Sequence, residues 1–562
     1  MVRSEIIMVG ENPTLAINGV PVAENAYITY FRKKACYGDF AKAGYKLYSV
    51  PLYFATRGIT EYNHIPPFDD GIFEGDEPDY SIIDSAFREI LDECPDAYIF
   101  PRVNMALPEK WERENPDELC DIGNLDMNKR RFCYSSDKWA EETKRLLGLF
   151  IDHIENSPYR DHVIAYQLAD GNTEEWFGFD LRGSIGKRSR EKFEEYKDRC
   201  GIEGTEEEYY GFLNEIAALR IIEFSDFAKE RTGGRVLIGS FYGYTFECPN
   251  RTSNHHALRY VLESKSVDFL CSPISYIDLR ETGRDAPCML PLESLKQHGK
   301  LYFLESDART HLTLPLFDVP HFDNPHYKPR DLFHSVETLK MYYARSLIKA
   351  HAIWWFDMGG GWYRYPRYME MMRDFIGITE SAMKKDTSSV SEVAVIVDER
   401  SLDGFDSEEL NTISKPIVSN IRYQLGLMGA PYDAYLADDY ERIKEKYKAF
   451  ILLVPKPTAL MKRIAAESEG CLIINSETAD ITTDELRGYL RDRGVHIYSD
   501  KDAVIYANRS YLFLHTASIG EANIKMPEGL HLKEIYGDPI DVTKDVLPAR
   551  CSYLFEIVGE ND

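Results

Sequence analysis

The stretch HVIAYQLADGNTEEW, residues 162–176, joins a continuous apolar run to two adjacent glutamates and a tryptophan. Consecutive apolar positions are typical of a parallel strand whose two faces are both covered. Runs of this kind recur over roughly the first 385 residues. The candidate strands are 25–30, 46–54, 97–104, 162–169, 235–244, 267–273, 300–306 and 352–358. The stretch therefore predicts one strand of a larger parallel sheet.

Segments with helical periodicity separate these runs, and 135–156 and 330–350 are clear examples. Strand and helix alternate about eight times, which predicts a (β/α)₈ TIM barrel over residues 1–385. After KKDTSSVSE (384–392) the units shorten, and residues 390–500 predict a flavodoxin-like, doubly wound α/β domain. Its expected strands are VAVIVDE, AFILLVPK, CLIINS and VHIYS. Residues 502–562 predict a small antiparallel β domain.

The charge balance excludes several classes of partner. The chain of 562 residues carries a formal net charge of −27, so long-range repulsion opposes nucleic acid, anionic membranes and polyanions. A small neutral oligosaccharide or glycoside fits better. The N-terminal sequence MVRSEIIMVGENP lacks an apolar core of signal-peptide length, and no uncharged apolar run approaches the ~18 residues of a transmembrane helix. We therefore expect a soluble, cytoplasmic protein.

The sequence contains no motif typical of a nucleotide site and no histidine pair spaced to bind a metal. Neither GxGxxG nor GxxxxGK[ST] occurs, so the phosphate-binding loop of a nucleotide site is missing. His255 and His256 are adjacent and point in different directions, unlike the i, i+4 pair that chelates one metal. The sequence predicts neither a cofactor nor a metal site.

Functional residues of a (β/α)₈ barrel lie at the carboxyl ends of its strands. Many polar and aromatic residues stand at the predicted ends, and rings together with carboxylates suit a carbohydrate ligand. The predicted substrate-binding residues are Arg102, Glu174, Trp176, Tyr242, Tyr244, Tyr276, Asp307, Arg309, Trp355, Asp357 and Trp362. In particular, we expect Trp355, Trp362 and Tyr244 to line the cleft.

Two carboxyl groups on opposite sides of one pocket are the requirement for glycoside cleavage. Glu305 would be the nucleophile, kept ionised by Arg309 and other cations nearby. One of Glu174 and Glu175 would be the general acid and base, with a pKa raised by packing against the Trp176 indole. Taken singly, the glutamate pair could also be the first turn of a helix, and the group around Glu305 a surface ion-pair cluster.

With these residues at its strand ends, the chain resembles the retaining (β/α)₈ glycoside hydrolases, in particular family 42 β-galactosidases and the related family 164 β-mannosidases. The motifs that carry the resemblance are GNTEEW, SFYGYTFE, SPISY, HGKLYFLESDARTH and WWFDMGGGWY. It implies an acid/base at the end of strand four, a nucleophile at the end of strand seven and retention through a covalent glycosyl-enzyme. It also implies a homotrimer with the second domain as the assembly module, and no cofactor.

The chain departs from that family pattern beside the acid/base. Family members usually place Asn directly before the acid/base Glu, whereas here Thr173 precedes Glu174 and Glu174 precedes Glu175. We favour Glu175, which stands immediately before the tryptophan as in related sequences, and Glu174 remains the alternative. Because that Asn contacts the sugar 2-hydroxyl, both β-galactosides and β-mannosides are candidate substrates. The scattered cysteines argue against the structural zinc of some family members.

Two other functional classes compete with a glycosidase. A catalytically inactive carbohydrate-binding or scaffold protein could keep the pocket, although the presence of both acids counts against it. A glutaminase-like activity of residues 390–500 lacks the Cys at a strand-to-helix turn that such chemistry requires.

Overall fold

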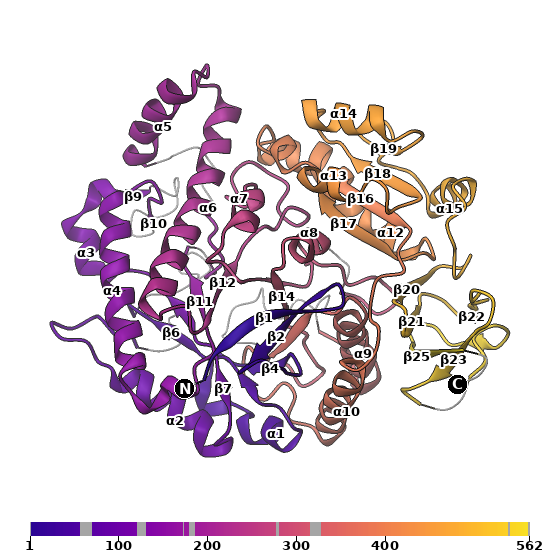
Figure 1. The fold of residues 1–562 in the computed structure, drawn as a ribbon, viewed down its shortest axis with the longest axis horizontal. Helices are drawn as coiled ribbons and strands as arrows, with labels where there is room; N and C mark the ends of the chain where they lie inside the picture. Colours follow the sequence, from indigo (N-terminus) through magenta and orange to yellow (C-terminus); the bar gives the residue numbers. More distant parts are fainter. Residues whose placement is uncertain are drawn as a thin grey trace.

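A computed structural model describes residues 2–56, 70–120, 131–171, 173–178, 186–276, 280–314, 328–537 and 540–559. Figure 1 shows a large barrel, a second sheet coloured orange and a third coloured yellow, arranged side by side.

Ten strand segments form the barrel sheet in the order β6-β8-β11-β12-β13-β14-β15-β4-β5-β7. All of its ladders are parallel. The segments β5 and β6 are two halves of one barrel strand, as are β7 and β8, so the sheet closes on itself as eight strands. They are β4 (Asn25–Ile28), β5 (Leu47–Tyr48), β6 (Pro51–Tyr53), β7 (Tyr98–Ile99), β8 (Arg102–Asn104), β11 (Ala165–Ala169), β12 (Leu237–Phe241), β13 (Phe269–Pro273), β14 (Leu301–Ser306) and β15 (Ala352–Phe356). The predicted (β/α)₈ barrel and its eight strands are confirmed.

Helices surround the barrel and bury their apolar faces against the outside of its strands (Figure 1). They are α1 (Tyr37–Lys42), α2 (Ser81–Glu93), α4 (Asp137–Glu155), α6 (Glu206–Arg231), α7 (Leu258–Glu263), α8 (Leu292–Gln297), α9 (Leu332–Ile348) and α10 (Pro366–Ala382), with α3 (Glu109–Glu114) and α5 (Lys187–Cys200) in the loops. Inside the barrel a separate cluster packs, with Phe100, Phe269, Phe303 and Trp354 among its members. The barrel therefore has an outer core and an inner core.

An N-terminal hairpin that we did not predict covers the amino ends of the barrel strands. It consists of β1 (Ser4–Val9), β2 (Asn12–Ile17) and the short β3 (Val20–Pro21). The Ser4 backbone N–H donates to the Arg235 carbonyl at 3.0 Å, and Leu15 and Ile17 pack into the inner core. The carboxyl ends of the strands, where functional residues of such a barrel lie, are at the opposite end from this hairpin.

A four-stranded parallel sheet follows the barrel in the order β17-β16-β18-β19, as a doubly wound fold requires. It contains β16 (Val393–Val397), β17 (Tyr432–Leu436), β18 (Ala449–Leu453) and β19 (Leu472–Ile474), with α12 (Arg422–Leu427), α13 (Tyr440–Ile443), α14 (Ala459–Glu467) and α15 (Thr483–Asp492). The strand predicted at VHIYS is wrong. Residues 495–499 form no ladder, and the Tyr498 N–H instead donates to the Gly429 carbonyl in a loop contact of 2.8 Å.

The last part of the chain forms an antiparallel sheet in the order β20-β21-β25-β23. Its strands are β20 (Ala503–Ala507), β21 (Tyr511–Thr516), β23 (Leu530–Glu534) and β25 (Ser552–Gly559), beside the short pair β22 (Gly520–Glu521) and β24 (Val546–Leu547). The predicted order of fold types along the chain is therefore confirmed. The division into domains at 385–390 and 500–502 stays a prediction.

Candidate active site

Glu305 lies on the inner face of the barrel near the carboxyl end of β14. Its neighbours Tyr302 and Leu304 belong to the outer core, whereas Leu301 and Phe303 belong to the inner core. Because side chains alternate along a strand, Glu305 follows the inner set. Its side chain is almost fully buried and forms an ion pair with Arg102 of β8.

Arg102 joins Glu305 to a second carboxylate. Its Nη1 lies 3.3 Å from Oε2 of Glu174, the same oxygen that accepts a hydrogen bond of 2.9 Å from the Tyr30 hydroxyl. The Nε of Arg102 donates to Gln167 at 3.2 Å. All of these groups lie within the barrel mouth, so one guanidinium balances two buried carboxyl groups.

Glu175 lies beside Tyr244, which follows β12. It is half-buried, and its two carboxylate oxygens accept hydrogen bonds from the Tyr244 hydroxyl at 2.8 Å and the Thr173 hydroxyl at 2.5 Å. Thr173, Glu174 and Trp176 all have positive φ, between 55° and 69°. Such conformations cost of order 1–3 kcal/mol each for residues other than glycine, and strain of this kind concentrates at functional sites.

Glu175 and Glu305 both have raised pKa values, and the charges that act on the two carboxyl groups differ. Removal from water, and then the charge of Glu305, raise the pKa of Glu175 to about 8. Removal from water also raises the pKa of Glu305, to about 7, and the Arg102 guanidinium opposes that rise. The pair can therefore hold one proton near neutral pH, on the Glu175 side.

Arg102 is one cation that contacts Glu305, and the role predicted for Arg309 stays a prediction. Arg309 is half-buried. The carboxylate of Asp307 is held by Arg280, which donates to both oxygens at 2.7 and 2.8 Å. The same guanidinium stacks on Tyr276 at 4.1 Å from the ring centroid, and this ring remains 40% exposed. Tyr276 is therefore an exposed aromatic ring that Arg280 holds in place.

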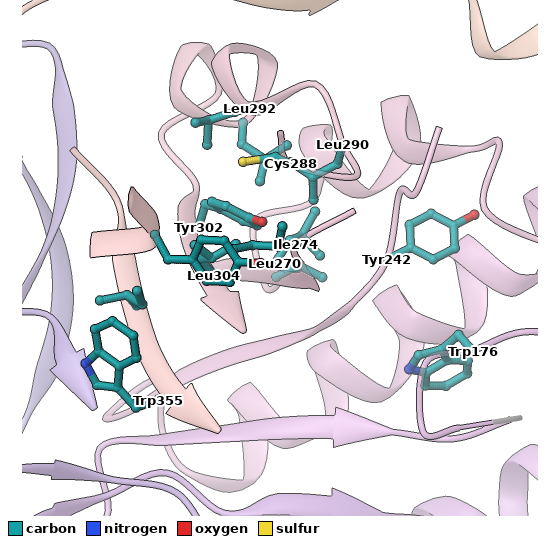
Figure 2. Packing of buried hydrophobic residues seen from close by; sticks show 14 of the residues in the cluster. Trp176, Tyr242, Leu270, Ile274, Cys288, Leu290, Leu292, Tyr302, Leu304 and Trp355 are labelled. Carbon is teal, nitrogen blue, oxygen red and sulfur yellow. The ribbon is translucent and has the colours of Figure 1, made fainter. Parts of the chain in front are cut away.

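Three predicted substrate-binding residues lie in the outer core instead of the cleft, and Figure 2 labels them together with other members of this buried cluster. The Trp355 Nε1–H donates to the Tyr45 hydroxyl at 2.9 Å. The Trp176 Nε1–H donates to the Leu168 carbonyl at 3.2 Å, and the Tyr242 hydroxyl donates to the Asn214 carbonyl at 3.2 Å. The predicted roles of Trp355, Trp176 and Tyr242 in the cleft are wrong, because each side chain points to the helix side.

Asp357 is also a structural residue and not a ligand-binding one. It is fully buried, and its carboxylate accepts hydrogen bonds from the Tyr27 hydroxyl and from the backbone N–H groups of Gly361 and Trp362, all at 2.7–2.8 Å. These bonds hold the turn after β15. Trp362 is 3% exposed, close to the 4% of Glu305, and its predicted place in the lining of the cleft stays a prediction.

Sequence reasoning missed three residues that contact the candidate glutamates. Tyr30 binds Glu174, the Trp354 Nε1–H donates to Glu305 at 3.3 Å, and His255 binds the backbone carbonyl of Glu175 at 2.9 Å. Trp354 was detectable in principle, because alternation places only one of the adjacent tryptophans inside the barrel. Tyr30 and His255 depend on loop conformation, which leaves no periodic signal.

Among the described residues, no group of three or more His, Cys, Asp or Glu side chains is placed to hold a metal ion. Within the same part of the chain, none of the helices combines the length and the apolar character needed to cross a membrane.

Comparison with solved structures finds a similar fold in β-galactosidases and in an exo-carrageenase. The cold-adapted β-galactosidase from Rahnella sp. R3 superposes with a TM-score of 0.59 at 11% identity, over 95% of this chain and 98% of that one. A family 42 exo-carrageenase from Bacteroides ovatus gives a TM-score of 0.59 at 12% identity, over 99% and 86%. The β-galactosidase from Halorubrum lacusprofundi gives 0.56 at 13% identity, over 95% and 99%. No protein-family model matches the chain, and no curated protein is similar to it in sequence. At these identities the likeness establishes a shared fold over nearly the whole chain.

Proposed function

We propose that the protein is a retaining, exo-acting β-glycosidase that cleaves β-galactosides or β-mannosides. The observation that carries the proposal is the pair of carboxyl groups of Glu175 and Glu305: hydroxyl groups alone bind the Glu175 carboxyl group in the described contacts, whereas Arg102 forms an ion pair with Glu305. Glycoside cleavage with retention needs one protonated and one ionised carboxyl group in one pocket. The shared fold with β-galactosidases supports the same reaction class.

In the first step, the Glu175 carboxyl group gives its proton to the glycosidic oxygen while a Glu305 oxygen attacks the anomeric carbon. The bond from that carbon to the leaving oxygen breaks, and a glycosyl ester on Glu305 forms. Tyr244, which donates to Glu175 at 2.8 Å, stabilises the carboxylate left behind. Arg102 keeps Glu305 ionised until it attacks.

In the second step, the Glu175 carboxylate takes a proton from water, and the water oxygen attacks the anomeric carbon. The ester bond to Glu305 breaks, so both carboxyl groups return to their starting states and the sugar retains its configuration. The mechanism requires the two carboxyl groups to lie roughly 5–5.5 Å apart.

Glu174 is the alternative acid, and its contacts support a different role. It is fully buried and bound to Arg102 and Tyr30, whereas Glu175 is half-buried and free of direct contact with a cation in the described contacts. A proton donor must reach the leaving group, which favours Glu175.

The test uses 4-nitrophenyl β-galactoside, β-mannoside, β-glucoside and β-fucoside with the wild type and Glu305→Gln, Glu175→Ala and Glu174→Ala. We expect turnover of one sugar, its loss by several orders of magnitude in Glu305→Gln, and partial rescue by azide in Glu175→Ala only. Proton NMR of the first product would show the β-anomer. Binding of a sugar without turnover by the wild type would instead indicate an inactive carbohydrate-binding protein.

The family resemblance also leads us to propose a homotrimer. Size-exclusion chromatography with light scattering measures the mass directly, and a monomeric mass near 64.8 kDa would contradict this proposal.

A further inference from the structure

His255 lies beside the candidate acid and belongs to the loop between β12 and α7. Its Nδ1 accepts hydrogen bonds from two backbone N–H groups, those of Gly243 at 3.1 Å and Tyr244 at 3.2 Å. Its Nε2 lies 2.9 Å from the backbone carbonyl oxygen of Glu175. Because two donors face Nδ1 and an acceptor faces Nε2, the proton must sit on Nε2. The ring is therefore a neutral imidazole in one defined tautomer.

The surroundings of His255 keep it neutral. The side chain is fully buried and packs against three aromatic rings, those of Phe177, Tyr242 and Tyr244, at centroid distances of 4.4, 5.0 and 4.5 Å. Burial lowers the pKa of His255 to about 3, although the Glu175 carbonyl raises it and His256 lowers it further. Across neutral pH the ring keeps its single hydrogen-bond pattern.

These contacts connect the two segments that form the acid site. Tyr244 follows β12, and its hydroxyl binds the Glu175 carboxyl group. His255 binds the backbone of both residues, so side chain and main chain are fixed to one another through a closed set of bonds. Glu175 also sits between two residues with positive φ, Glu174 and Trp176, and such a turn persists only where its surroundings hold it.

The loop that carries His255 is itself anchored outside the barrel. The His256 ring lies 3.3 Å from Asp403 and 2.8 Å from the Cys248 carbonyl, and the Leu258 N–H donates to Glu399 at 2.8 Å. Asp403 and Glu399 both follow β16 of the second sheet. Contacts with residues that follow β16 therefore hold the loop that carries His255.

We infer that His255 is a positioning residue that holds Glu175 and Tyr244 in the geometry for proton transfer. The inference rests on the proposed function, because it assigns a role in that same site. It concerns the acid alone, since none of the described contacts of His255 reach Glu305. A misplaced acid should slow the cleavage of poor leaving groups, which need a proton, much more than that of good leaving groups, which do not.

The test is a leaving-group series on the β-glycoside that the wild type turns over, from 2,4-dinitrophenyl through 4-nitrophenyl to phenyl. The variant His255→Phe keeps a ring for the aromatic packing and removes all three hydrogen bonds. We expect kcat/KM for the phenyl glycoside to fall roughly 10–100-fold, consistent with the cost of misplacing a reacting group by about 1 Å. For the 2,4-dinitrophenyl glycoside we expect a change of less than threefold, and the alkaline limb of the pH profile should shift.

The matched control is His351→Phe. His351 is also buried and neutral, packs against Tyr302 and lies at the amino end of β15, away from the candidate carboxyl groups. This variant should leave the leaving-group dependence unchanged. If His255→Phe does not fold, His255→Asn retains an acceptor near the position of Nδ1 and removes the donor to Glu175. This variant should also lose kcat/KM for the phenyl glycoside more than for the 2,4-dinitrophenyl glycoside, by a smaller factor.

The outcomes separate the two proposals. Equal losses for all leaving groups in the His255 variants, with an active wild type, would reduce the residue to a structural role and overturn the inference. An inactive wild type on every glycoside would overturn the proposed function and the inference with it.

Discussion

Two half-buried glutamates lie at opposite ends of the same barrel, Glu175 at the carboxyl ends of the strands and Glu24 at the amino ends, just before β4. The pKa of each is raised to about 8, and removal from water is the largest cause in both. They differ in the next cause. At Glu175 it is the charge of Glu305, which raises the pKa further, whereas at Glu24 it is the backbone N–H of Leu15, which lowers it.

The comparison shows that a shifted pKa does not by itself mark a site. Glu24 receives the N–H of the hairpin strand β2 and borders a cavity of about 90 Å³. It is a polar link between the hairpin and the barrel. Glu175 lies close enough to Glu305 for that charge to raise its pKa, and only this pairing supplies an acid and a nucleophile together.

The largest expected contrast is in catalysis. Glu175→Gln removes the proposed acid and should lower kcat/KM for a phenyl glycoside, whose leaving group needs a proton, by about 10²–10⁴-fold, the range for general acid–base catalysis. Glu24→Gln makes the same chemical change at the other end and should alter kcat/KM by less than twofold. Steady-state kinetics of both variants check this, and comparable losses in the two would remove the functional distinction between the barrel ends.

The pH dependence of activity should reflect the pair at the mouth. The reaction needs Glu305 ionised and Glu175 protonated, so kcat/KM should be greatest between about pH 7 and pH 8. Below this window Glu305 gains a proton, and above it Glu175 loses one, so activity falls about tenfold per pH unit on each side. In Glu175→Gln the alkaline limb should disappear. A limb that survives in this variant would assign the acid to another group.

At the other end, the raised pKa of Glu24 should appear in stability. The folded state holds the Glu24 proton up to about pH 8, whereas the unfolded state releases it near pH 4.5. The folded state thus binds more protons between these values, and the free energy of unfolding falls as pH rises, by up to about 1.4 kcal/mol per pH unit from this group. Urea unfolding of the wild type and Glu24→Gln from pH 5 to pH 9 measures it. The variant should gain stability relative to the wild type as pH rises. If the free energies of unfolding of the two proteins changed in parallel with pH, the raised pKa of Glu24 would be contradicted.

Sequence patterns predicted the barrel because its strands are continuous apolar runs separated by amphipathic helices, and the strand-end rule located Glu175 and Glu305. The N-terminal hairpin was missed because SEIIMVG and NPTLAI are short and weakly patterned. VHIYS has the composition of a strand, but the structure provides it with no neighbouring strand. The pairing of Arg102 with Glu174 and Glu305 joins residues 72 and 203 positions apart, and no local pattern reveals such a contact. The error at Trp355 came from a single unknown, the face of the strand to which its ring points.

Trp354 and Trp355 test that unknown directly, because they are adjacent in β15 and point to opposite sides of it. The Trp354 indole donates to Glu305 inside the barrel, and the Trp355 indole donates to Tyr45 among the helices. Trp354→Phe removes one hydrogen bond to the nucleophile, worth about 0.5–1.5 kcal/mol, and should lower kcat/KM about 2–10-fold. The pKa of Glu305, read from the acid side of the pH profile, should rise, because this hydrogen bond favours the ionised carboxylate. Trp355→Phe should lower the free energy of unfolding and leave the pH profile of kcat/KM unchanged. If Trp355→Phe moved the acid limb and Trp354→Phe did not, the inward and outward assignments along β15 would be reversed, and the arrangement of Arg102 and Glu305 at the mouth would have to be revised with them.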